Sequence, residues 1–379
     1  MKKLNEIKVG YLKVAVLFIP IILYGPFVFS LQAYPPIRIG LYILLSFYLF
    51  FKHTRYFKND VLYFCVLMLL SVIMMLGNKT GTAGLFTTGN YLLTLFFAWG
   101  LFRYFSTSLD RAEILTALYV KFFYLVSTCS LLSLFYFNIF GELNFFDISK
   151  SSYDYKVTPF GLLLAKNFGP IIVNRSFFYF IEPLYLGVFY AANIILIAPH
   201  VKVNSRLFIM FNVLGGWLTY SFSFYILLIA LYIIKNIKNN FFVKIIFLFF
   251  VSFYLIFSDI FIYSSLENRL ERLFLFADSI RNANVSELFF GYGVRMSVGS
   301  KMGFGSGLAI SLSEIGIIGT FLQLFMLYKI RPSLITFVFF ILTSLICDPI
   351  KLPIFWLTLI ITSHTLSPQP NYNVHGWGK

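Results

Sequence analysis

Charged residues are scarce in this chain of 379 residues: Asp, Glu, Lys and Arg together make up 12% of it. Soluble domains carry about 25%, and a soluble protein of this length could not cover its surface with half that share. Disorder is also excluded, because disordered chains are poor in aromatic residues, whereas 21% of this chain is Phe, Trp or Tyr. The remaining class is a membrane protein with many spans.

Residues for thiol, metal and nucleotide chemistry are also few. The 3 Cys lack the paired spacing of a disulfide framework or a thiolate metal site. The sequence contains no Asp-x-Asp pair, and no GxxxxGK[ST] motif, which excludes an ATPase. We therefore expect no metal site and no cofactor.

Apolar sequence, in contrast, is abundant, at 59% hydrophobic residues. A helix needs about 20 apolar residues to cross a bilayer, and about twelve runs approach this length. They predict an all-α, polytopic transmembrane bundle that forms one integral membrane domain, residues 1–379. The expected spans are about 11–29, 37–51, 61–77, 87–105, 113–139, 184–199, 206–219, 221–235, 243–263, 306–328, 333–347 and 350–363.

The pair 206–219 and 221–235 could also form one long helix. Gly215, Gly216 and the cluster Thr219, Ser221 and Ser223 favour a break between them.

The net charge of +15 reflects membrane orientation rather than nucleic-acid binding. Short inner loops are rich in Lys and Arg, and an inner N-terminus places sixteen of these residues inside and three in the short outer segments. The C-terminus and a polar tail, 364–379, are then also cytoplasmic. The three outer residues are Arg38, Lys79 and Lys351, and the inner ones are Lys2, Lys3, Lys8, Lys52, Arg55, Lys58, Arg103, Arg111, Lys202, Arg206, Lys235, Lys238, Lys244, Lys329, Arg331 and Lys379.

Two outer loops are long, 140–183 and 264–305, and connections of this length are usually functional or disordered. The second opens with SSLENRLERLFLFADSI, whose apolar residues recur at helical spacing. This pattern predicts an amphipathic helix on the outer membrane surface, and we expect amphipathic helices in both of the large outer loops. The topology leaves no His on the outer side, because all 4 lie toward the inside.

The first loop ends in RSFFYFIEP, which contains Arg175 and Glu182. Pro183 fits the first position of a helix with Glu182 before it. If the stretch is helical, Arg175 and Glu182 share a face two turns apart. Glu182 is then either a helix cap or a carboxylate at the mouth of a cavity, and Arg175 either binds a ligand or reaches toward lipid phosphate.

The second loop carries Arg269, Arg272, Arg281 and Arg295, with Gly291-Tyr292-Gly293 just before the last of them. Arginine binds phosphate through a planar fork, so these residues indicate a pyrophosphate ligand, although a solvated helix surface explains any one of them. The glycines permit a tight turn or close approach of the backbone to a ligand.

Glu314 follows in SEIGIIGTF, about eight residues into its span and so roughly 12 Å below the outer surface. Carboxylates at such depth usually face a cavity or a partner. Gly316 and Gly319 beside it permit close helix packing.

These features resemble the Wzy-type O-antigen (repeat-unit) polymerases, which are related to O-antigen ligases. The resemblance rests on the many spans with two large outer loops, on NRSFFYFIEP before a span, on the Arg-bearing loop ending in LFFGYG, and on SEIGIIGTF opening the next span. It covers about residues 160–320. The ligases use a His in the second large loop, where this chain has none.

The resemblance implies a membrane glycosyltransferase of the bacterial inner membrane, active at its outer face in lipopolysaccharide biosynthesis. Its donor and acceptor are glycans on undecaprenyl pyrophosphate, transfer is inverting and metal-independent, and a chain-length regulator protein is a candidate partner. Arg175, Arg272, Arg281 and Arg295 would stabilise the leaving pyrophosphate, and Glu182 or Glu314 would deprotonate the acceptor hydroxyl. An O-antigen ligase and a lipid-linked oligosaccharide flippase are the alternatives.

Overall fold

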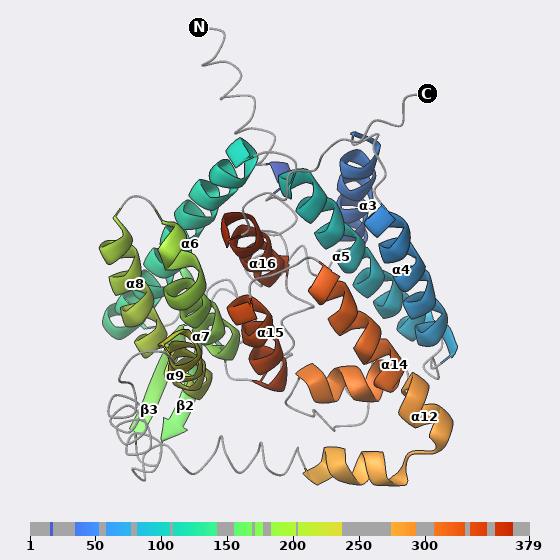
Figure 1. Cartoon of the computed structure of the whole chain (residues 1–379). Coiled ribbons are helices and arrows are strands. Elements are labelled where there is room, and N and C mark those ends of the chain that lie inside the picture. The colour runs from blue at the N-terminus through green and yellow to red at the C-terminus, as the bar shows by residue number, and fades with distance from the viewer. Residues whose placement is uncertain are drawn as a thin grey trace, which may run out of the picture.

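The structure, a computed structural model, is mostly helical in the residues that it describes (Figure 1). These residues are 16–17, 35–52, 58–76, 82–106, 109–141, 155–168, 171–176, 183–201, 204–236, 274–292, 307–329, 334–346 and 353–366.

Nine helices coincide with predicted apolar runs, because each run is long enough to satisfy its own backbone hydrogen bonds as a helix. Among the other predicted spans, 243–263 and most of 11–29 lie outside the described residues. The nine are α3 (Pro35–Lys52), α4 (Lys58–Leu76), α5 (Thr82–Ser106), α6 (Leu109–Phe140), α8 (Ser205–Leu218), α9 (Phe222–Asn236), α14 (Gly307–Lys329), α15 (Leu334–Ile346) and α16 (Pro353–Leu366).

The break predicted between the two short runs is confirmed, since α8 and α9 are separate helices. The Thr219 hydroxyl donates to the carbonyl of Gly216 at 2.6 Å, which satisfies one carbonyl at the end of α8. Tyr220 then adopts φ 45°, a left-handed conformation that stops the helix.

The predicted run 184–199 is helical throughout but changes its winding. It comprises α7 (Pro183–Ala192), a π-helical turn η2 (Asn193–Ile197) and a 3-10 turn η3 (Ala198–His200). Short π-helical turns inside α-helices are frequent at functional positions, and this one places Asn193 in the fully buried interior.

The first long loop departs from the all-α prediction, because residues 155–176 form an antiparallel sheet instead of an amphipathic helix. Its strands are β1 (Tyr155–Thr158), β2 (Gly161–Phe168) and β3 (Ile171–Ser176), in the order β1-β2-β3. Two-residue connections pair Thr158 with Gly161 and Phe168 with Ile171. The sheet packs on α6 and buries Leu163.

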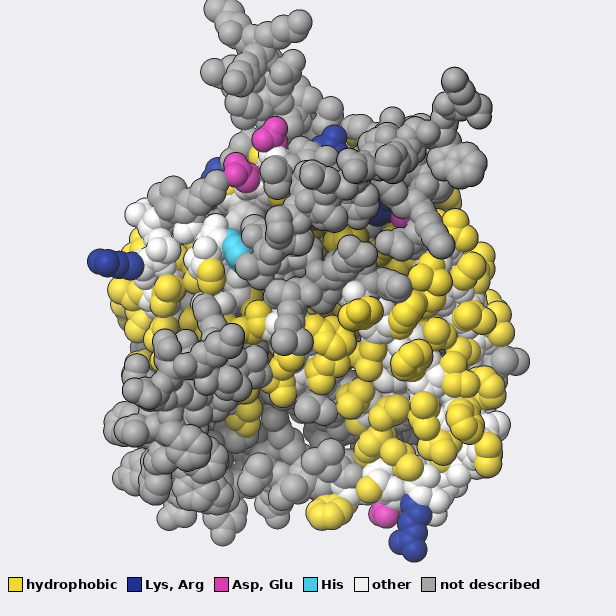
Figure 2. Space-filling model, in the orientation of Figure 1, with side chains coloured by type: hydrophobic (Ala, Val, Ile, Leu, Met, Phe, Trp, Pro, Cys, Tyr) yellow, Lys and Arg dark blue, Asp and Glu magenta, His cyan; other side chains and the backbone are white. Residues whose placement is uncertain are grey.

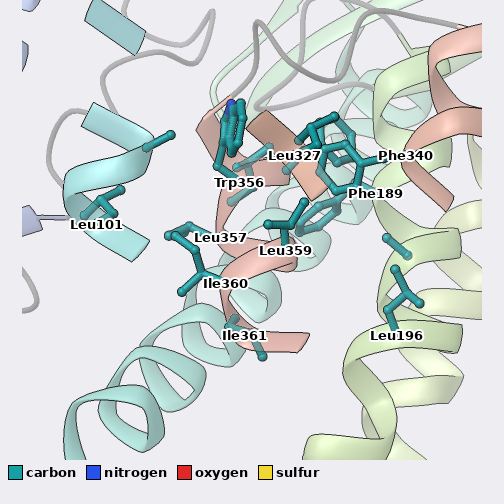
Figure 3. Close-up of a cluster of buried hydrophobic side chains, with 14 of the residues drawn as sticks. Leu101, Phe189, Leu196, Leu327, Phe340, Trp356, Leu357, Leu359, Ile360 and Ile361 are labelled. Atoms are coloured by element: carbon teal, nitrogen blue, oxygen red, sulfur yellow. The ribbon is translucent and has the colours of Figure 1, made fainter. Parts of the chain in front are cut away.

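The core of the bundle surrounds α16, whose residues 354–363 are all buried. In Figure 3, Leu357 and Ile360 point toward the side where Leu101 of α5 lies, and Leu359 points toward Phe189 of α7. A helix that is buried on every side is typical of the centre of a large helical bundle.

The surface of the described residues exposes many large apolar side chains. Phe135 on α6, Trp217 on α8 and Phe321 on α14 are 64%, 54% and 64% exposed. Figure 2 shows charged side chains in the upper part and at the lower edge of this face, with hydrophobic side chains between them. Two described segments, Asp110–Phe140 and Leu308–Tyr328, are long and apolar enough to cross a membrane.

Candidate functional site

Residues 274–292 of the second long loop form a corner against α14. A helix over 274–282 agrees with part of the amphipathic helix predicted there, and α12 (Val285–Phe290) follows it. The Asn284 side chain accepts a hydrogen bond from the amide of Glu287 at 2.8 Å, and the Glu287 carboxylate accepts one from the amide of Asn284 at 3.0 Å. This reciprocal capping fixes where α12 begins.

Two glycines bring α12 and α14 into backbone contact. Gly291 has φ 80° and ψ 176°, and Gly316 has φ 66° and ψ −172°, a region that is essentially restricted to glycine. A β-carbon on Gly291 would lie 2.5 Å from the carbonyl carbon of Glu314, and one on Gly316 would lie 2.6 Å from the amide nitrogen of Gly291. The corner therefore depends on the absence of a side chain at both positions.

The conformation of Gly316 divides α14 into two limbs, which meet near α12 in Figure 1. The sequence predicted one uninterrupted span over 306–328, so this break is a correction. Its cause is tertiary, because the Gly316 backbone lies against Phe289 and Gly291 of the α12 corner.

Glu314 lies two residues before the break and is only 5% exposed. Next to it in sequence, the Ser313 carbonyl accepts a hydrogen bond from the amide of Tyr292 at 2.7 Å. The structure thus brings together Gly291, Tyr292 and Glu314 of the predicted site. A carboxylate held in a protein interior is a suitable general base if an acceptor hydroxyl can reach it.

Arg281 belongs to the helix that is joined to the same corner. The Tyr292 hydroxyl donates to the carbonyl of Ser279 at 3.1 Å, and Ser279 precedes Arg281 by two residues. The Arg281 side chain is exposed, so it is available to a ligand at the surface of this corner.

Arg175 lies in a different part of the molecule. It is a half-buried residue of β3, paired with Leu164 of β2, so the expectation of a shared helical face with Glu182 is wrong for Arg175. In Figure 1 the sheet and α12 lie at opposite sides of the lower end of the bundle. The structure therefore does not bring Arg175 and Arg281 together.

The other predicted site residues, Glu182, Arg272, Gly293 and Arg295, lie outside the described residues. The helix start beside Glu182 is confirmed, since α7 begins at Pro183. Within the described part of the chain, no three His, Cys, Asp or Glu side chains are grouped so that they could hold a metal ion.

The sequence reasoning missed a buried ion pair between α4 and α5. The Asp60 carboxylate lies 3.1 Å from Nε of Arg103 and accepts a hydrogen bond from the indole of Trp99 at 3.0 Å. Tyr63 stacks on Trp99 with ring centroids 4.1 Å apart. Arg103 had been counted only as an inner-loop charge. Its position four residues after Trp99, on the same helical face, was the available signal.

A second polar contact, also missed, joins three helical segments in the core. The Tyr119 hydroxyl of α6 donates to Oδ1 of Asn193 at 2.7 Å and lies 3.3 Å from the Thr358 hydroxyl of α16. All three residues are fully buried. Hydrogen bonds of this kind fix the relative positions of apolar helices.

The chain matches no protein-family model, no curated protein and no solved structure.

Proposed function

We propose that the protein is a membrane glycosyltransferase that polymerises repeat units linked to undecaprenyl pyrophosphate at the outer face of the bacterial inner membrane. The exposed apolar surface between two charged zones supports a position within a bilayer. About twelve spans with both termini inside are the topology that the Lys and Arg distribution favours.

The corner of α12 and α14 is the proposed centre of this activity. The observation that carries the proposal is a buried carboxylate, Glu314, fixed at a helix break by close backbone contact with Gly291. Irregular backbone at membrane depth is tolerated where it is buried in protein or lines a water-filled cavity. Such a position suits a polar group that meets a glycan from the outer side.

The reaction would be a single displacement. The hydroxyl oxygen of the acceptor sugar forms a bond to the anomeric carbon of the donor glycan, while the bond from that carbon to the pyrophosphate oxygen breaks. The hydroxyl proton passes to a carboxylate, Glu314 or Glu182. The electron pair leaves with the lipid pyrophosphate, whose charge arginine side chains would stabilise. The configuration at the anomeric carbon is inverted.

Membrane lipids and the two lipid-linked glycans are the expected partners, with a chain-length regulator protein as a further candidate. Arg281 is the described arginine best situated for the leaving group, because its helix is tied to the Glu314 corner through Tyr292. Arg272 and Arg295 belong to the same loop in sequence, and Arg175 would act from the first loop.

The lipid-linked and surface glycans of a deletion strain test the proposal. We expect single repeat units on the final glycolipid, and restored long chains when the gene is returned. Long chains that stay unattached would instead identify a ligase. Repeats trapped on the inner side would identify a flippase.

Reporter fusions test the orientation separately. Fusions after residues 160 and 285 should report the outer side, and fusions after 203 and 240 the inner side. An inner signal at 285 would place Arg281 on the wrong side for this reaction.

A further inference from the structure

The outer surface of residues 274–290 carries large apolar side chains. Phe274 and Ile280 lie on the first helix of this segment, and both are exposed. Val285 and Phe289 are exposed on one face of α12, four residues apart. The exposed fraction reaches 68% at Phe274 and 73% at Val285. Single exposed apolar residues are ordinary, whereas a group of them indicates an interaction surface, and we call these four side chains the loop patch.

Polar and charged side chains accompany the loop patch. Asp278, Arg281 and Asn282 of the first helix are exposed, and the Glu287 carboxylate belongs to the cap of α12. In Figure 2, an acidic and a basic side chain lie at the lower edge of the molecule close to a hydrophobic one, at the end where Figure 1 places this segment. Helices that expose both apolar and charged residues are typical of the boundary between lipid headgroups and acyl chains.

The loop patch continues the apolar surface of two predicted spans. The helix α12 contacts α14 and also α4, and in Figure 1 it lies near the lower end of α4. Hydrophobic side chains are exposed on these helices too, among them Met75 near the end of α4, and Ile317 and Phe321 on α14. A bilayer around the bundle would cover these side chains up to its headgroups, which lie beside the outer ends of the spans. Lipid thus accounts for the loop patch without a separate protein partner.

We propose that residues 274–290 insert the loop patch into the outer boundary of the bilayer, between headgroups and acyl chains, while Asp278 and Arg281 stay among the headgroups. The inference rests on the outer location of this loop in the proposed function. The sequence pattern over 264–280 predicted a surface helix before α12, and the present inference adds Val285 and Phe289 of α12 to the membrane contact.

Insertion of the loop patch would fix the depth of the Glu314 corner. The helix α12 ends at Gly291, whose backbone lies against the peptide group of Glu314, and the Tyr292 amide donates to the carbonyl of Ser313 at 2.7 Å. A shift of α12 toward or away from the membrane would therefore move this part of α14 with it. Arg281 would lie at the level of the lipid phosphates, where a lipid anchor also holds its pyrophosphate.

Depth measurements with nitroxide labels test this inference in the full-length protein, reconstituted in vesicles of phosphatidylethanolamine and phosphatidylglycerol. Phe274→Cys and Val285→Cys are made in a chain whose natural cysteines, Cys65, Cys129 and Cys347, are replaced by alanine, and each new cysteine is labelled. Collision of the label with oxygen, which dissolves in lipid, is compared with its collision with a water-soluble nickel chelate. Both labels should lie about 5–10 Å below the lipid phosphates.

Asn282→Cys is the matched control, because Asn282 is an exposed polar residue of the same segment. Its label should stay at or above the phosphates and collide more often with the nickel chelate. Equal access of the chelate to all three labels would overturn the proposal, since the loop patch would then face water. Low collision with both reagents at 274 and 285 would also overturn it, and would indicate that a protein surface, such as a second copy of the chain, covers the loop patch.

The labels report depth whether or not the protein polymerises a glycan. A protein that inserts the loop patch but extends no lipid-linked repeat would therefore contradict the proposed function and leave this inference intact. A protein that extends repeats while the labels at 274 and 285 face water would do the opposite.

Discussion

Gly291 lies against the peptide group of Glu314 so closely that a β-carbon would approach the Glu314 carbonyl carbon and oxygen to 2.5 Å. The contact joins the end of α12 to α14 just before the break at Gly316. It connects the surface helices of the second loop with the buried carboxylate proposed to act as the base.

Gly291→Ala should therefore displace Glu314 and reduce chain extension strongly. The new methyl group meets backbone rather than a flexible side chain, and φ 80° with ψ 176° disfavours any residue with a β-carbon. We expect mostly single repeats at near-normal membrane abundance, together with a lower thermal unfolding midpoint. The glycan ladder and the abundance are measured together.

Gly89→Ala provides the control for this variant. Gly89 lies within α5, and a β-carbon there would meet nothing within 4 Å. Replacement of glycine by alanine at a compatible helical position is neutral or stabilising. A full ladder for Gly291→Ala would mean that the corner is not part of the catalytic centre.

Asp60→Asn should destabilise the bundle without a direct effect on the reaction. Asp60 and Arg103 are 1% and 5% exposed, and loss of one partner from a buried ion pair typically costs about 3–5 kcal/mol. The thermal unfolding midpoint of the purified protein measures the loss of stability. The double variant Asp60→Leu with Arg103→Met should recover much of the lost stability, because it removes both buried charges. Equal stability of Asp60→Asn and the natural sequence would contradict the assignment.

The helices could be predicted from the sequence because hydropathy and helical length are local properties. The break at Thr219 and Tyr220 was also predictable, since glycine and small polar residues interrupt two apolar runs. The sheet over 155–176 was not predicted, because its strands are short and apolar and the loop was expected to be helical. In the sequence, Pro159 and the pair Gly169-Pro170 interrupt the apolar runs, and this was the signal that favoured hairpins.

The site was predicted only in part, because it depends on contacts between segments that are distant in the chain. Gly316 and Gly319 look alike in sequence, and only the contact with α12 decides that Gly316 adopts the broken conformation. Similarly, Asp60 and Arg103 are 43 residues apart in the chain, and their pairing follows from the packing of α4 on α5. Contacts between distant segments are not encoded in local composition.

Glu314→Gln should abolish or severely slow polymerisation while the protein still folds. The amide keeps the shape of the side chain but cannot accept the acceptor proton, and general-base catalysis typically contributes about 10²–10⁴-fold. The rate is measured with purified protein and lipid-linked repeat units. Glu113→Gln, an exposed carboxylate of α6, should leave the rate unchanged.

Glu182→Gln in the same assay separates the two candidate bases. If Glu314→Gln retains the full rate and Glu182→Gln does not, the base is in the first loop.

Polymerisation should persist in EDTA. The outer side of the predicted topology has no His, and the chain has no Asp-x-Asp pair. The proposed reaction instead uses fixed arginines to stabilise the leaving pyrophosphate. Chain extension by the purified protein is compared with and without the chelator. Activity lost in EDTA and restored by Mg²⁺ or Mn²⁺ would refute the metal-independent reaction.

The arginines give the most demanding prediction, because Arg→Lys keeps the charge and removes the planar fork. Arg281 lies two residues from Ser279, whose carbonyl is bound by Tyr292 at the Glu314 corner. If Arg281 binds pyrophosphate, Arg281→Lys should lose one preorganised donor, which typically slows a reaction roughly a hundredfold. We expect at least two of the Lys variants at Arg175, Arg272, Arg281 and Arg295 to make single repeats or very short chains.

Arg206→Lys distinguishes this role from a general need for surface charge. Arg206 is exposed at the start of α8, on the predicted inner side, where no pyrophosphate substrate is expected. Exposed ion pairs contribute only about 0–1 kcal/mol, so Arg206→Lys should give full-length glycan at normal abundance. Should all four outer Lys variants behave like Arg206→Lys, the arginines would be surface residues, and the leaving group would have to be stabilised elsewhere. A defect confined to Arg272, Arg281 and Arg295 would place the pyrophosphate at the second loop alone, as the separation of the sheet from α12 favours.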